Sequence, residues 1–409
     1  LVMEVEVETG DNSPKYADPV DCYYNTSSVY LSCSQALSLV TVPNPESVSP
    51  DTVGQGAQNY SIHITGTDFN YDDIVKCYQN GSYISGVSVY SVVIDTTASP
   101  QTIDFNCDVP VSQSTGTYQW RIERNGASSY YGEINFTISL APTSGVTTPS
   151  DASIQKSVSA ISGTSNSPTT IDKVFIRIQN PGENYWTGTG WGAETWIEAS
   201  ANPTTGDWTW DASSVTWSSE LGQYNITSKA WDDYGGRESP GSGINFHFDA
   251  TPPDVYISVP TDNLYSAVPF DDSTPLQGTS SDNSWDYTTK FGNEQVEVDI
   301  FNVSTVKHWH DDVNQWLEGE YWCVATGTAP WTYSIAASSW VSNCNYTISA
   351  KVLDKAGNYS SVVVSSFTYD VYQSDPERPD TLIQDPPWDS YRGSQWLENT
   401  GISGTAQDN

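Results

Sequence analysis

Apolar and polar residues alternate along most of this chain, in short runs separated by turn residues. The segments "KVFIRIQ", residues 173–179, and "QVEVDIF", residues 295–301, carry apolar side chains at every second position. Alternation of this period is typical of strands with one buried face. Ser, Thr, Gly, Asn and Asp fill the intervening stretches and favour turns, and we find no helical stripe. The pattern predicts an all-β fold.

One phrase recurs along the chain and brings a longer unit into register. Its copies are "ISGTSNSP" from Ile161, "LQGTSSDN" from Leu276 and "ISGTAQDN" from Ile402. After the first two copies the strand patterns also align, so that Trp208 corresponds to Trp331 and Asp232 to Asp354. A repeat built of short strands at regular spacing predicts tandem immunoglobulin-like β-sandwiches.

Proline-rich segments such as "DATPPDVYISVP" separate the units and predict extended linkers. We therefore expect a strand and a disulfide loop at 1–40, or alternatively the end of a preceding module, then sandwiches at 41–141, 142–250 and 251–372, and the start of a further repeat at 373–409. Since the last copy of the phrase would begin that further sandwich, we expect the chain to be a mature or excised piece of a longer protein.

Residues 142–372 resemble two tandem bacterial or archaeal immunoglobulin-like (Big-type) repeats of large cell-surface proteins. The resemblance lies in "AKVLDKAGN" from Ala350 and "DATPP" from Asp249. The first of the two units departs from the family pattern, because Gly235 and Gly236 replace the Ala-Gly-Asn and the opening phrase lacks its Asp. The fold that the resemblance implies is a sandwich in both units.

Residues 41–141 resemble another immunoglobulin-like sandwich, the IPT/TIG domain. The similar segments are a Pro-bounded strand at Asn44–Pro50, a Gly-x-x-Phe turn at Gly66–Phe69 and a Cys-x-x-Pro segment at Cys107–Pro110. The whole chain is thereby expected to be a row of sandwiches.

Charge narrows the choice of partners. The net charge of −35 comes from 50 acidic and 15 basic side chains, so nucleic acid and anionic membranes would repel the chain. No apolar run approaches the roughly 20 residues of a membrane helix, and we expect no membrane insertion within this segment. The 16 Trp and 25 Tyr residues exclude a disordered acidic tail.

Six cysteines fall in three close couples without metal-binding spacing. We expect local disulfides in an oxidising compartment, with buried free thiols as the alternative. The couples are Cys22 with Cys33, Cys77 with Cys107, and Cys323 with Cys344.

Calcium is the expected cation, because hard oxygen ligands are abundant and the resemblance implies Ca²⁺ at the Asp of the D-x-A-G-N turn. No organic cofactor is expected. The expected ligand groups are Asp232 and Asp233 with Asp249 and Asp254, and Asp354 with Asp370 and Asp375; Asp282 and Asp408 are weaker candidates. The alternative is that these carboxylates only cap turns.

Two other features suggest ligands. Trp191 and Trp316, at expected hairpin tips, are candidates for contact with a glycan. His308 and His310 share one face of a strand and are candidates to hold a transition metal with Asp312, the alternative being an exposed polar tip. Eight sequons permit N-glycosylation, at Asn25, Asn59, Asn80, Asn135, Asn225, Asn302, Asn345 and Asn358.

These features favour a structural role over catalysis. There are only four His residues and no nucleophile elbow, P-loop or HExxH motif, so we expect no enzyme. We expect a segment of an extracellular, cell-surface stalk, surface layer (S-layer) or filament that self-assembles into a polymer or array. The alternatives are an adhesin or carbohydrate-binding surface protein, and a non-catalytic spacer of a larger secreted enzyme.

Overall fold

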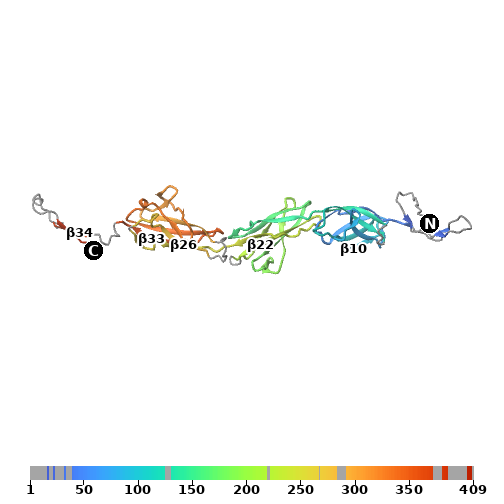
Figure 1. The fold of residues 1–409 in the computed structure, drawn as a ribbon, viewed down its shortest axis with the longest axis horizontal. Coiled ribbons are helices and arrows are strands. Elements are labelled where there is room, and N and C mark those ends of the chain that lie inside the picture. The colour runs from blue at the N-terminus through green and yellow to red at the C-terminus, as the bar shows by residue number, and fades with distance from the viewer. Residues whose placement is uncertain are drawn as a thin grey trace. The chain divides into compact units, whose positions relative to one another are not determined.

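The computed structural model describes residues 41–124, 130–218, 222–266, 268–282 and 292–371. In the flanking segments it also places six short strands, β1 to β4, β34 and β35, for which only the backbone pairing is described. The described elements are strands, apart from short 3₁₀ turns such as Ala337–Ser339 (Figure 1). The predicted all-β class is confirmed. In the described ranges, no helix has the length and hydropathy to cross a membrane.

The chain divides into two compact units. The first comprises Leu1–Ser153, Val158–Thr216 and Gln223–Phe246, and the second comprises Ile154–Ser157, Trp217–Gly222 and His247–Asn409. The first unit contains the first sandwich and most of the second, and the second unit contains the third sandwich together with β15 (Ile154–Gln155) and the end of β23 (Ile244–Phe248). The sequence-based boundaries 41–141, 142–250 and 251–372 stay predictions.

The first sandwich packs a four-stranded sheet, ordered β10-β11-β7-β5, on a five-stranded sheet, ordered β6-β13-β12-β8-β9. Its aromatic centre is Trp120, whose ring stacks on Phe136 at 4.1 Å between centroids and meets the edge of Phe105 at 5.0 Å. The strands are β5 Asn44–Ser49, β6 Thr52–Gly54, β7 Tyr60–Thr67, β8 Ile74–Gln79, β9 Ser82–Tyr83, β10 Ser88–Asp95, β11 Gln101–Asp108, β12 Gly116–Glu123 and β13 Tyr131–Ser139.

The second sandwich is a continuous sheet, ordered β14-β16-β21-β20-β17-β22-β23-β15, that folds over itself at β20. Strand β20 pairs with β17 through Ile197 and with β21 through Ala201, so it belongs to both layers. The strands are β14 Thr143–Thr148, β15 Ile154–Gln155, β16 Ala160–Asn166, β17 Ile171–Gln179, β18 Tyr185–Trp186, β19 Trp191–Gly192, β20 Ile197–Ala201, β21 Asp207–Asp211, β22 Gln223–Asp232 and β23 Ile244–Phe248.

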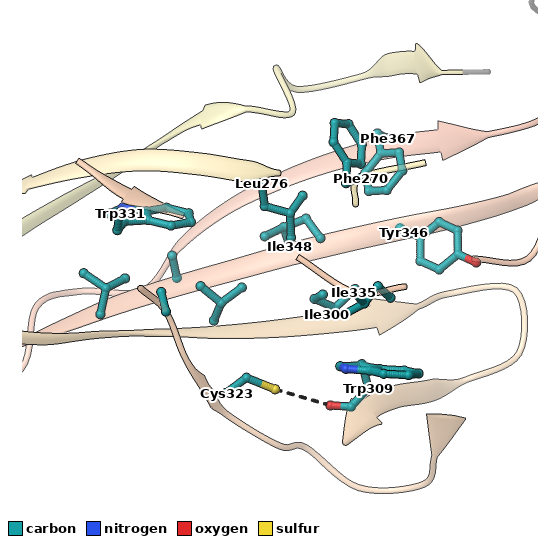
Figure 2. Close-up of a cluster of buried hydrophobic side chains, with 14 of the residues drawn as sticks. Phe270, Leu276, Ile300, Trp309, Cys323, Trp331, Ile335, Tyr346, Ile348 and Phe367 are labelled. Carbon is teal, nitrogen blue, oxygen red and sulfur yellow. Dashed lines mark hydrogen bonds between the residues drawn. The ribbon is translucent and has the colours of Figure 1, made fainter. Parts of the chain in front are cut away.

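The third sandwich has sheets ordered β24-β26-β31 and β25-β33-β32-β27-β28-β29, with β30 also paired to β27. Side chains from both sheets meet in one core, where Leu276, Ile348 and Phe367 lie among large aromatic rings (Figure 2). The strands are β24 Asp254–Val259, β25 Leu264–Ser266, β26 Leu276–Ser281, β27 Asn293–Asn302, β28 Lys307–His310, β29 Gln315–Leu317, β30 Cys323–Val324, β31 Trp331–Tyr333, β32 Cys344–Asp354 and β33 Val363–Tyr369.

The glycine of the recurring phrase is required by the tryptophan that recurs with it. Gly163 lies against Trp208 and Gly278 against Trp331, and a Cβ at either glycine would overlap the indole ring and a carbonyl oxygen of the neighbouring strand. Both tryptophans are core residues, 2% and 0% exposed. In the second and third sandwiches, the phrase therefore marks the strand whose glycine makes room for a core tryptophan.

The three copies of the phrase pair in the same way. Strand β16 pairs with β14, β26 with β24, and β35 (Ser403–Gln407) with β34 (Asp380–Asp385), in each case antiparallel and with a register shift near the end of the pair. In the last two, Asp254 opposes Ser281 and Asp380 opposes Gln407, which are corresponding positions of the repeat. The strand expected in "ISGTAQDN" is thus present.

Candidate metal centre

Three aspartates of the second unit converge at one end of the third sandwich. Asp249 follows β23 directly, Asp282 follows β26, and Asp354 is the last residue of β32. Each offers one carboxylate oxygen to a group whose atoms all lie within 4.8 Å of one another. We call these three residues the aspartate cluster. Among the described residues it is the one group of three or more His, Cys, Asp or Glu side chains that is close enough to hold a metal ion.

Two members of the cluster are buried and held by short hydrogen bonds. Asp354 is 0% exposed, and its carboxylate accepts from the Asn358 backbone N–H at 2.7 Å and from Asn358 Nδ2 at 2.8 Å. Asp249 is 3% exposed and accepts at Oδ1 from the Thr251 N–H at 3.0 Å. Asn358 Nδ2 also donates to the Asp249 carbonyl oxygen at 2.9 Å, which ties the two segments together.

Electrostatics favour a cation at this position. Asp249 and Asp354 form no ion pair with any described residue, and all the donors to their carboxylates are neutral. Burial raises the pKa of Asp249, and the nearby Asp354 charge raises it further. A divalent cation would relieve both the burial cost and the mutual repulsion of the carboxylates.

An additional oxygen lies beside the cluster. Asn293 opposes Asp354 in the β27–β32 ladder, and its Nδ2 donates to Ser280 Oγ at 2.6 Å. Its Oδ1 is buried and has no hydrogen-bond partner among the described residues. Buried polar atoms are nearly always satisfied, and an amide oxygen is an ordinary Ca²⁺ ligand. The residues present therefore fit a calcium ion.

The corresponding place in the second sandwich lacks the carboxylate of Asp282 and the amide oxygen of Asn293. There Asp232 takes the place of Asp354, and Ser167 that of Asp282. Ser167 Oγ donates to Asp232 Oδ2 at 2.7 Å, and the Gly236 N–H donates to Oδ1 at 2.8 Å. Ile171 stands where the third sandwich has Asn293. Asp232 is thus a turn-forming carboxylate satisfied by neutral donors, as the alternative interpretation predicted.

The expected ligand groups need correction. Asp354 was grouped with Asp370, but Tyr369 opposes Cys344 at the other end of β32, which places Asp370 about 33 Å along the strand from Asp354. Asp370 accepts from Ser342 Oγ at 3.1 Å instead. Asp249 was grouped with Asp232 and lies in the cluster with Asp354 and Asp282.

The remaining candidates lie apart from the cluster or outside the described residues. Asp233 is exposed and accepts from Thr170 Oγ1, and Asp254 is exposed at the start of β24. Asp375 and Asp408 fall outside the described part of the chain. A sequence signal for the cluster is present in the repeat. Asp282 stands where the second sandwich has Ser167, and Asn293 stands where it has Ile171.

Two of the three expected disulfides are wrong. Cys77, Cys107, Cys323 and Cys344 are free thiols, all buried. Cys77 and Cys107 come from opposite sheets of the first sandwich and behave as small core side chains. Cys22 and Cys33 oppose each other in the pair β2 (Cys22–Tyr23) and β3 (Ser32–Cys33), but their side chains lie outside the described residues.

Strand register explains why Cys323 and Cys344 do not bond. Cys323 opposes Val298 on β27, whose partner on β32 is Ala350. Cys344 is six residues before Ala350, about 20 Å along an extended strand, and a disulfide needs Cα atoms within about 7 Å. The Cys323 thiol instead points to the Trp309 carbonyl oxygen at 3.7 Å (Figure 2).

These four thiols are expected to be inert until the chain unfolds. Burial raises the pKa of Cys77 and of Cys107 to about 12, and that of Cys323 to about 11, so the reactive thiolate is scarce at neutral pH. In iodoacetamide without reductant, mass spectrometry should find all four unmodified in the folded chain and alkylated in denaturant. A Cys323–Cys344 crosslinked peptide in a non-reducing digest would contradict the register.

The candidate ligand-contact tryptophans are packed. Trp191 donates from Nε1 to the Thr216 carbonyl oxygen at 3.1 Å and meets Trp186 edge-on at 5.4 Å. Trp316 packs against the third core and donates to the Ser339 carbonyl oxygen at 2.7 Å. Both remain half-buried, and glycan contact through them stays a prediction.

The His-rich tip does not gather metal ligands in the structure. His308 Nδ1 lies 2.8 Å from Asp299 Oδ1, and the His308 ring packs on Phe301. The His310 ring stacks on Tyr321 at 4.4 Å. Both histidines are thus engaged in pairs with neighbouring side chains.

The sequons differ in exposure. Asn302 is 1% exposed and donates to the Tyr346 hydroxyl at 3.2 Å, which argues against a glycan there. Asn225 and Asn358 are half-buried and use their amides in hydrogen bonds. Asn25 lies outside the described residues. The exposed ones, for which glycosylation stays a prediction, are Asn59, Asn80, Asn135 and Asn345.

Comparison with known proteins adds structural neighbours but no family. No family model matches the sequence, and no curated protein matches it. The fibronectin(III)-like modules of Clostridium thermocellum CbhA are 14% identical, with a TM-score of 0.29, over 56% of this chain and 94% of theirs. A tetra-tandem repeat from the extending region of a large adhesion protein is 17% identical, with a TM-score of 0.28, over 81% of this chain and 76% of its own. The FN1–FN3 domains of chicken CNTN1 are 11% identical, with a TM-score of 0.26, over 80% and 99%.

Proposed function

We propose that this chain is a segment of an extracellular structural repeat protein, a cell-surface stalk, surface layer or filament, in which immunoglobulin-like sandwiches serve as load-bearing spacers. One observation carries the proposal: the same strand pair, with its register shift near the end, occurs three times along the chain. Serial repetition of one sandwich extends a chain by a constant step, which is the property a stalk or filament requires.

The acidic surface and the proline-rich linkers support this role. A charge of −35 keeps the repeats soluble and concentrates cations around them. The four buried thiols give no support to an oxidising compartment, and the Cys22–Cys33 disulfide stays a prediction, so the cell-surface assignment rests on the Big-type and IPT/TIG resemblances and on the repeats themselves. Calcium at the aspartate cluster would fasten Asp249, in the linker before the third sandwich, to Asp282 and Asp354.

Self-assembly into a polymer or array is the part of the proposal that microscopy tests. Electron microscopy of the native assembly should show subunits at a fixed repeat, and sedimentation of the purified chain should show mass increasing with concentration. A native protein that is monodisperse and monomeric in both measurements would rule out the filament and the surface layer and favour a monomeric adhesin.

A further inference from the structure

The first unit contains a cleft of ligand size that the structural role does not use. Its volume is about 620 Å³, within the range of small-molecule sites. One wall comes from the first sandwich and includes Asn59, Tyr90 and Asp108; the other comes from the second sandwich and includes Lys229, Trp231 and Arg237. We call this space the interdomain cleft of the first unit.

The wall from the first sandwich is an ordered polar network. The Tyr90 hydroxyl donates to Asp108 Oδ1 at 2.8 Å, and the Asn59 backbone N–H donates to the same oxygen at 2.7 Å. Asn59 Oδ1 in turn accepts from Asn106 Nδ2 at 2.9 Å. These carboxylate, amide and phenol groups are the kind that exchange hydrogen bonds with hydroxyl groups of a ligand.

The opposite wall carries two cations without carboxylate partners among the described residues. Arg237 donates to Gln58 Oε1 at 2.7 Å, and its guanidinium lies 4.4 Å from the centre of the Trp231 ring. The Lys229 ammonium lies over two aromatic rings, 4.1 Å from the centre of the Trp196 ring and 5.7 Å from that of Phe175. Burial lowers the pKa of Lys229, and the Arg177 charge lowers it further; the Glu194 charge opposes this, but Glu194 forms its ion pair with Arg177, at 2.5 Å.

In the other two sandwiches, a basic side chain on the strand that corresponds to β22 is paired with a carboxylate on a neighbouring strand. In the third, Lys351 opposes Glu297 and pairs with it at 3.1 Å. In the first, Arg121 pairs with Glu133 at 2.6 Å on the neighbouring strand. In the second sandwich Lys229 opposes Phe175, so the carboxylate is missing at this place alone of the three.

The two carboxylates that line the cleft, Glu238 and Asp108, form no ion pair with Lys229 or Arg237. Glu238 also lines the space, but its oxygens accept from the Ser144 N–H at 2.9 Å, the Ser144 hydroxyl at 2.6 Å and the Ala230 N–H at 2.9 Å. Asp108 belongs to the polar network of the facing wall. Two cations facing a cleft in a chain of 50 acidic and 15 basic residues therefore call for an anion from outside.

We propose that the interdomain cleft of the first unit binds an acidic saccharide, a sugar that carries a carboxylate. The carboxylate pairs with Lys229 and Arg237, the Trp231 side chain covers the apolar face of the sugar, and the hydroxyls bond to Asn59 and Asp108. An acidic peptide fits less well, because it has no ring hydroxyls to bond to Asn59 and Asp108 and no apolar sugar face to lie against Trp231.

Calorimetric titration of the whole chain with a trigalacturonate and with neutral trigalactose as its matched probe tests the proposal. We expect the acidic sugar to bind and the neutral one to bind at least tenfold more weakly. Lys229→Gln should weaken binding of the acidic sugar about tenfold or more, because a charge-assisted hydrogen bond is lost. Lys173→Gln, on the same sheet but paired with Glu198, should leave it unchanged.

Phe175→Glu supplies the internal carboxylate that the third sandwich has opposite its lysine, and it should abolish binding while leaving the melting temperature near that of the parent. A tri-glutamate peptide distinguishes the ligand class. Equal binding of tri-glutamate and trigalacturonate, binding that survives Lys229→Gln, or no heat with the acidic sugar would each overturn the proposal.

Discussion

Replacing Trp331 with alanine is expected to lower the free energy of unfolding of the third sandwich by about 3–5 kcal/mol. Trp331 is 0% exposed and lies over Gly278, where no side chain can move in to fill the space. The substitution removes the indole from the core shown in Figure 2 and leaves a cavity beside Gly278 of β26. Scanning calorimetry of the whole chain measures the loss as a lower melting temperature for the second unit.

Trp208→Ala is the matched control for Trp331→Ala. Trp208 occupies the corresponding place over Gly163, but it belongs to the first unit. We expect each variant to shift a different calorimetric transition, since each removes a core side chain from a different unit. A single transition that moves equally in both variants would contradict the independence of the two units.

Phenylalanine at the same two positions separates packing from hydrogen bonding. Trp208 Nε1 donates to the Thr164 carbonyl oxygen at 3.1 Å, whereas Trp331 Nε1 is buried with no hydrogen-bond partner among the described residues. Trp208→Phe should therefore cost about 1 kcal/mol more than Trp331→Phe. Equal losses would mean that the indole hydrogen bond contributes nothing measurable.

Features that repeat along the chain were predictable from the sequence. The alternation of apolar residues gives the strands, and the recurring phrase gives the strand that pairs with β14, β24 and β34. The recurrence of Trp208 and Trp331 correctly indicates core positions, because a shared core must be filled in every copy. The sequence is sufficient to predict these features, since the period of apolar residues and the recurrence of a phrase can both be read along the chain without knowing which strands pair.

Features that depend on strand register were not predictable in this way. Cys323 and Cys344 are consecutive cysteines in the sequence, yet they lie on strands on opposite sides of β27 and are displaced along it. Strand register also separates Asp354 from Asp370 along β32. Asp249 lies near Asp354 through a contact between segments that are distant in sequence. The cleft depends on contacts between two sandwiches, and its missing carboxylate, opposite Lys229, is visible only when the cross-strand partner is known.

Calcium is expected to stabilise the second unit by about 2.7 kcal/mol at a free concentration one hundred times the dissociation constant, because it binds only the folded cluster. Excess chelator should lower the melting temperature of that unit in calorimetry and leave the first unit unchanged. Asp282→Ser introduces the residue that the second sandwich has at this position and should remove the calcium effect. Asp312→Asn, at the exposed tip after β28, is the matched control and should retain it.

The pH dependence of the calcium effect follows from the pKa of Asp249. A carboxyl whose folded pKa is raised contributes stability that is present below its unfolded pKa, near the ordinary value of 3.8, and is lost as the pH rises through the folded pKa. The metal-free cluster is therefore most costly at neutral pH, where calcium offsets the most repulsion. We expect the calcium-induced rise in melting temperature to be largest near neutral pH and to shrink as the pH falls toward about 4, where protons compete for Asp249. A rise that is independent of pH, or that persists in Asp282→Ser, would place calcium elsewhere on this acidic chain.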